Sequence, residues 1–167
     1  MSNVTTLLAL REPANRVSPR AVTYWRVNAG IGTAVAAVIA AAVWFFVPSW
    51  PWWATAIVAV VGVWCLVELL IAPTFRYRVH RWEVDEIAVH TREGWLSLDS
   101  RIAPLNRVQT VDSSQGPLMR LFHIASITVT TASAAGPITI NGLDEDEAKR
   151  LVAHLTRTTA ATEGDAT

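Results

Sequence analysis

Residues 26–68 decide the fold class, and they read RVNAGIGTAVAAVIAAAVWFFVPSWPWWATAIVAVVGVWCLVE. No side chain between Arg26 and Glu68 carries a charge, and a helix needs roughly 20 apolar residues to cross a bilayer. The run is long enough for two spans. The segment Pro48-Ser49-Trp50-Pro51 divides it, because proline denies the backbone its helical hydrogen bonds. We therefore expect an integral membrane protein with spans at about 28–47 and 52–72.

Basic residues predict the orientation of this hairpin. The turn between the spans has no charge, whereas seven arginines flank the spans: Arg11, Arg16, Arg20, Arg26, Arg76, Arg78 and Arg81. The positive-inside rule then places both termini in the cytoplasm, in a multi-pass protein of the plasma (inner) membrane. A cleaved signal peptide is disfavoured, because a second apolar run follows the first after four residues.

The composition argues against several classes of function. Residues 73–167 carry ten bases against twelve acids, without the clustered basic face that binds nucleic acid. The single cysteine, Cys65, cannot form an intramolecular disulfide. The four histidines lack metal-site spacing, and the sequence has no phosphate-binding glycine loop or nucleophile motif. We expect no metal, cofactor, small-molecule substrate or catalytic residue, and hence a protein that is not an enzyme.

Two features inside the spans leave alternatives open. Glu68 lies near the end of the second span, where a carboxylate can reach water or an arginine. Alternatively, it is the intramembrane polar site of an oligomeric small transporter or channel subunit, which needs several copies because two helices cannot enclose a pathway. Small residues at four-residue spacing allow close packing on the second span or on another copy: Gly30 and Ala34, and Gly32, Ala36 and Ala40.

The pattern changes after Pro73, which we expect to close the second span. Phe75, Tyr77 and Val79 alternate with polar residues, which predicts a strand. Further strands are expected near 87–89, 95–102, 108–111, 124–131 and 137–140, with turns between them. Asp144 then begins an amphipathic helix whose apolar stripe is Ala148, Leu151, Val152 and Leu155.

The expected fold class is therefore an α+β membrane protein, in which a transmembrane helical hairpin precedes an antiparallel barrel or sandwich capped by a C-terminal helix. The predicted divisions are a cytoplasmic N-terminal arm at 1–26, the hairpin at 27–72, the domain at 73–158 and a disordered tail at 159–167.

Three segments carry a family resemblance: PLNRVQ at 104–109, QGPLMRLF at 115–122, and Gly142-Leu143 before the last helix. With Ser18-Pro19-Arg20 and Tyr24-Trp25-Arg26 before the spans, the chain resembles YdbS-like bacterial membrane proteins with a bacterial pleckstrin-homology domain, from about Val17 to Leu155. His123 departs from the glycine usual in that family. The resemblance implies a pleckstrin-homology fold and mostly structural motif residues: Pro104, Gln109, Gln115, Gly116, Pro117, Leu118, Leu121, Phe122 and Gly142.

These features predict a membrane-anchored interaction module that binds another membrane protein with the same domain type, or a second copy of itself. The resemblance also implies a role in envelope stress or peptide tolerance. Arginines that could face a partner or anionic lipid are Arg76, Arg78, Arg107 and Arg120. The predicted first hairpin, residues 83–86, reads EVDE, and this acidity argues against specific inositide recognition.

Overall fold

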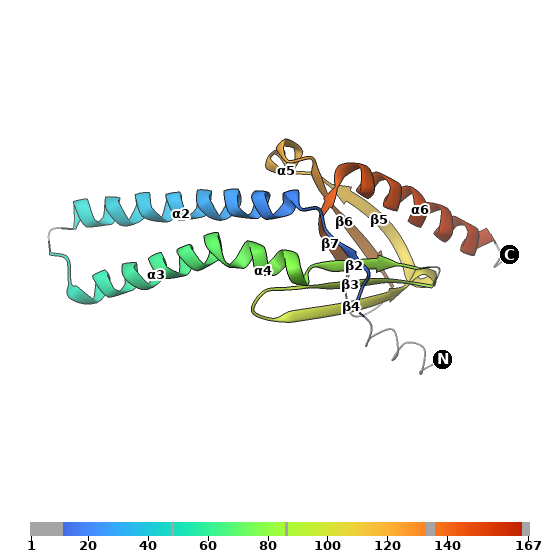
Figure 1. Cartoon of the computed structure of the whole chain (residues 1–167), viewed down its shortest axis with the longest axis horizontal. Coiled ribbons are helices and arrows are strands. Elements are labelled where there is room, and N and C mark those ends of the chain that lie inside the picture. Colours follow the sequence, from blue (N-terminus) through green and yellow to red (C-terminus); the bar gives the residue numbers. More distant parts are fainter. Residues whose placement is uncertain (1–11, 48, 86, 133–135, 165–167) are drawn as a thin grey trace.

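The computed structural model describes residues 12–47, 49–85, 87–132 and 136–164, with side chains up to Thr158. A helical hairpin projects from one end of a β domain (Figure 1). Its helices are α2 (Arg20–Phe46) and α3 (Trp52–Leu70), both long and apolar enough to cross a membrane. Their aliphatic side chains are mostly exposed, because no other described part of the chain covers them.

The first helix begins earlier than the sequence suggested. Pro19 occupies the N-cap position, and the Ser18 hydroxyl accepts a hydrogen bond from the Arg20 N–H at 3.3 Å. The helix therefore starts eight residues before the expected span. Residues 20–26, expected in the N-terminal arm, form its first two turns.

The prediction of a strand that contains Phe75, Tyr77 and Val79 is wrong. These residues lie in a short helix, α4 (Ala72–Val79), which follows α3 after Ile71. Pro73 lies in the first turn of α4. N–H groups in a first turn have no acceptor within their own helix, so the N–H that proline lacks costs no helical hydrogen bond there. Proline thus starts this helix, and the alternation of apolar and basic residues does not mark a strand.

Two antiparallel sheets form the domain. The first has the order β1 (Asn15–Arg16), β2 (Arg81–Val84), β3 (Ala88–Gly94) and β4 (Leu98–Pro104), and the second β5 (Val108–Ser114), β6 (Ile124–Thr131) and β7 (Ile138–Asp144). The 3-10 turn η1 (Leu105–Arg107) connects the sheets, and α5 (Pro117–Leu121) connects β5 with β6. Trp95 and Leu96, expected in a strand, lie in the turn between β3 and β4.

The segment before the hairpin belongs to the domain. Asn15 and Arg16 pair with Trp82 and Arg81, and the Ser18 N–H donates to the Gly142 carbonyl at 2.8 Å. Strands on either side of the hairpin are therefore neighbours in one sheet. The expected domain start at residue 73 leaves out this strand.

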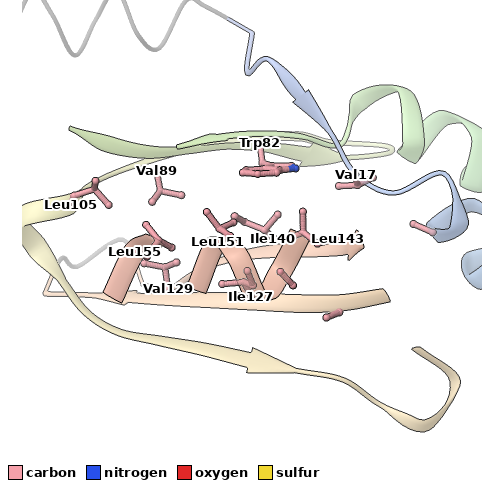
Figure 2. Close-up of a cluster of buried hydrophobic side chains, with 13 residues drawn as sticks. Val17, Trp82, Val89, Leu105, Ile127, Val129, Ile140, Leu143, Leu151 and Leu155 are labelled. Carbon is pink, nitrogen blue, oxygen red and sulfur yellow. The ribbon is translucent and has the colours of Figure 1, made fainter. Parts of the chain in front are cut away.

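The core lies between the two sheets and the last helix, α6 (Glu145–Gly164). Figure 2 shows Leu151 and Leu155 of α6 between side chains of the two sheets, including Val89 and Val129. The predicted apolar stripe of the helix is thus confirmed, as is the α+β fold class. The helix also continues through residues 159–164, which the sequence had suggested were disordered, and residues 165–167 lie outside the described part of the chain.

Candidate functional site

Three adjoining cavities lead from the domain into the groove between α2 and α3. The first, of about 540 Å³, lies where the hairpin meets the domain. It shares Trp25, Asn28 and Arg76 with a second cavity of about 330 Å³. The second shares Thr33 and Cys65 with a third of about 630 Å³, whose walls are mainly aliphatic. The groove is therefore continuous along its lining residues.

Polar side chains gather in the first cavity. The Nε2 atom of His80 lies 3.3 Å from Oε2 of Glu93, and the Trp25 ring lies against His80 with centroids 5.4 Å apart. The hydrogen bond from His80 is the main cause that lowers the pKa of Glu93, so this carboxylate is ionised at neutral pH. Two residues that line this cavity each have a buried nitrogen without a hydrogen-bond partner among the described residues: Nδ1 of His80 and Nε1 of Trp95.

Glu68 lies in the second cavity. Its Oε2 is 3.7 Å from Nη2 of Arg76, a long but attractive contact at the foot of the hairpin. Nearby, Arg26 of α2 donates to the Thr74 hydroxyl of α4 at 3.2 Å. A carboxylate near the span end does reach an arginine here. A Cβ added at Gly30 would lie 3.8 Å from Cδ1 of Leu69, an ordinary contact, whereas a Cβ added at Gly32 would meet nothing within 4 Å.

The four candidate arginines do not form one surface. Arg76 lines the first two cavities, and Arg78 is exposed on the same helix. Arg107 precedes β5 and Arg120 follows it, so a seven-residue strand, about 20 Å long at 3.3 Å per residue, lies between them. The structure thus places Arg107 and Arg120 at opposite ends of β5.

The family motif around α5 attaches this helix to its neighbours. Gln115 Nε2 donates to the Ile124 carbonyl at 2.9 Å, and the Phe122 ring meets Tyr24 of α2 edge-on at 6.4 Å. Leu121, one of the motif residues to which the resemblance gives a mostly structural role, is 70% exposed. His123 has a φ of 54°, in the left-handed region that favours glycine, and its N–H donates to the Arg120 carbonyl.

The remaining motif residues lie at connections between elements. Pro104 ends β4, and Gln109 is exposed at an irregularity in the pairing of β5 with β6. Gly142 of β7 has a φ of +78°, and a Cβ there would lie 2.8 Å from the Cβ of Ala21. This glycine lets β7 touch the first turn of α2.

Sequence reasoning missed Glu93 and His80. They come from β3 and the residue after α4, and no motif links them; only the packing of α4 beside the β3–β4 hairpin brings them together. Over the described residues, no group of three or more histidine, cysteine or acidic side chains is placed to bind a metal.

Two comparisons with known proteins identify the class. The Bacterial PH domain family model matches residues 26–159, so the chain belongs to that family, as the motifs indicated. It is similar to the UPF0699 transmembrane protein YdbS of Bacillus subtilis (strain 168), with 34% identity over 159 residues that cover 92% of this chain and 98% of that protein. The chain is thus a YdbS-like membrane protein with a bacterial PH domain. No solved structure matches it.

Proposed function

We propose that this protein is a non-enzymatic interaction module, anchored in the plasma membrane by two spans and carrying its domain on the cytoplasmic side. The pairing of β1 with β2 supports this topology, because these strands lie directly before and after the helical hairpin. A water-soluble sheet that includes both strands requires both ends of the hairpin on one side of the bilayer. The flanking arginines favour the cytoplasm for that side.

Cysteine labelling tests the topology in a Cys65→Ser background. A single cysteine at Ser49, in the turn of the hairpin, should react with an impermeant reagent from outside the cell. A cysteine at Ser114, exposed on β5, should react only after permeabilisation. The opposite pattern would invert the orientation, and labelling of both sites from outside would refute the hairpin.

The outer edge of β5 is the proposed partner surface. Within the described chain, β5 pairs with β6 only, and five of its seven residues are exposed. An unpaired strand edge is a ready template for addition of another strand. Arg107 and Arg120 at its two ends would then contact one partner that extends along the strand. We expect that partner to be a second copy of this chain or a membrane protein with the same domain type.

Photo-crosslinking in native membranes tests this surface. A crosslinking amino acid at Thr110 of β5 should join two differently tagged copies of the chain, or join the chain to another protein with this domain. The same probe at His154, exposed on α6, is the matched control. Equal products from both positions, or none from Thr110, would remove β5 as the interface.

Charge reversal separates the contributions of the two ends. Arg107→Glu and Arg120→Glu should each reduce the Thr110 crosslink while the protein stays in the membrane. The competing proposal, an oligomeric transporter or channel subunit, depends on Glu68. Expressed in a deletion strain, Glu68→Gln should keep the crosslink and complement the deletion like the wild type if the protein is an interaction module, but should fail to complement it in an ion-coupled transporter. A role in envelope stress, which rests on the family resemblance, can be scored in the same deletion background.

A further inference from the structure

We infer that the groove between α2 and α3 binds one zwitterionic phospholipid of the surrounding leaflet, with its ammonium-bearing headgroup in the first cavity and acyl chain in the third. This site does not depend on the proposed partner surface, which lies on β5. It follows from the order in which the groove changes polarity, from the charges at its polar end, and from where that end lies relative to the bilayer.

The polarity of the groove changes in the same order as the parts of a phospholipid. At the domain end, the first cavity is bordered by Arg76, His80, Glu93 and Asn141. The second retains Arg76 and Glu68 but is otherwise mostly apolar or small. The third, between the bodies of the helices, has only Thr33, Cys65 and Trp50 among aliphatic side chains and glycine. A phospholipid, with a charged headgroup joined to an apolar acyl chain, matches this order.

The charges at the polar end suit a zwitterion. The Arg76 guanidinium has five N–H donors, so a phosphate can share it with the distant Glu68 carboxylate. Glu93 offers an anion for an ammonium group, and the Trp25 and Trp95 rings in the same wall provide aromatic faces that attract cations.

Exposed apolar side chains indicate where the first cavity lies relative to the bilayer. Leu96, at the tip of the β3–β4 hairpin, is 74% exposed, and Leu121 of α5 is similarly exposed. Figure 1 shows both elements on the side of the domain from which the helices leave. Trp95 packs edge-on against Phe75 of α4, which ties the hairpin tip to the foot of the spans. The cavity between these elements therefore lies at the level of the lipid headgroups.

Native mass spectrometry of the full-length protein tests this site. The protein is purified in mild detergent, delipidated and titrated with phosphatidylethanolamine or phosphatidylglycerol of identical acyl chains. We expect one phosphatidylethanolamine per chain, bound at least tenfold more tightly than phosphatidylglycerol, which lacks the ammonium. Soluble phosphoethanolamine should not displace it, because the acyl chains also bind.

Variants test which residue binds the ammonium and which binds the phosphate of the headgroup. Glu93→Gln should abolish the preference for phosphatidylethanolamine, and Arg76→Gln should weaken both lipids about tenfold. Arg78→Gln, on the same helix but outside the cavities, and the surface variant Asp112→Asn should change neither. Circular dichroism of each variant checks folding. If Glu93→Gln does not fold, two measurements still test the inference: the relative affinity of the wild-type protein for the two lipids, and the comparison of Arg76→Gln with Arg78→Gln.

Four results would overturn the inference. They are equal binding of the two lipids by the wild-type protein, a preference that survives in folded Glu93→Gln, complete displacement by soluble phosphoethanolamine, and a lipid-free dimer that retains no phosphatidylethanolamine. The last would assign the groove to a second copy of the chain.

Discussion

Side chains of the same type are exposed in the hairpin and buried in the domain. Val60 of α3 is 70% exposed, while Val89 and Val129 of the two sheets are fully buried. In the domain, the chain supplies its own apolar surroundings from two sheets and a helix. In the hairpin, two helices can shield only their facing sides, so the surroundings must come from lipid. Composition alone therefore does not decide how much a side chain stabilises the fold.

The two regions meet in the first turn of α2. Ala21 is buried in the domain core, and Val17 just before the helix joins it there, although the rest of α2 is largely exposed. Arg20 in the same turn donates to Asp144 of β7 at 3.0 Å. One continuous helix thus begins in the domain core and ends among lipid, so a substitution should act differently at its two ends.

The largest effect should come from truncating a core leucine. Leu155→Ala removes a fully buried side chain between the sheets and should destabilise the domain by about 2–5 kcal/mol. Leu70→Ala, the same change at an exposed position of α3, should leave domain stability within about 0.5 kcal/mol. Hydrogen exchange of the β6 amides in detergent measures both. Similar losses in the two variants would contradict the division between the regions.

The next effect should arise where β7 crosses α2. Gly142→Ala forces a Cβ into a left-handed backbone and against Ala21, and should cost about 2–4 kcal/mol. Gly32→Ala places a methyl group in open space further along α2, outside the domain, so it should leave the stability of the domain within about 0.5 kcal/mol. Chemical denaturation of the domain compares the two. A tolerated Gly142→Ala would mean that hairpin and domain are not closely packed there.

A smaller effect of opposite sign is expected at His123. Glycine adopts its φ of 54° without the penalty of a Cβ, so His123→Gly should stabilise the domain by about 0.5–1 kcal/mol. The matched substitution His154→Gly lies in a regular, exposed stretch of α6 and should destabilise by about 0.5 kcal/mol. Midpoints of thermal unfolding test this difference in sign.

The smallest effect should be on acid stability. The pKa of Glu93 is lowered below its ordinary value of 4.5, chiefly by the hydrogen bond from His80. Its contribution to stability is therefore complete above about pH 4.5 and is lost as the pH falls through the lower, folded-state pKa. Glu93→Gln should remove that acidic component and leave the remainder of the profile unchanged. Unfolding measured between pH 7 and pH 3 gives both profiles, and identical slopes would exclude the contribution.

Local patterns predicted much of this fold. The uncharged run with its central prolines indicated both apolar helices, and β-branched runs indicated strands such as β6, whose expected range of 124–131 matches the structure. The stripe on α6 identified three residues that are buried: Ala148, Leu151 and Leu155. In each case one physical preference acts along a single stretch of sequence.

The errors arose where distant segments decide the structure. Two-residue periodicity between Phe75 and Val79 suggested a strand, but helical continuation from Ile71 prevailed. No local signal marks Asn15 and Arg16 as a strand, because their partners lie beyond the whole hairpin. Glu93 and His80 were missed as cavity residues for the same reason, whereas the motif positions Gly142 and His123 indicated special backbone conformations without revealing their contacts.

The pairing of β1 with β2 also sets an order of events during synthesis. Arg16 leaves the ribosome about 65 residues before its partner Arg81, and both membrane helices are made in between. At roughly 5–20 residues per second, β1 waits about 3–13 seconds as a single strand. The strand before the hairpin can therefore join the sheet only after the whole hairpin has been synthesised. A chain that carries only one end of the hairpin across the membrane cannot form that pair, so its first sheet lacks β1.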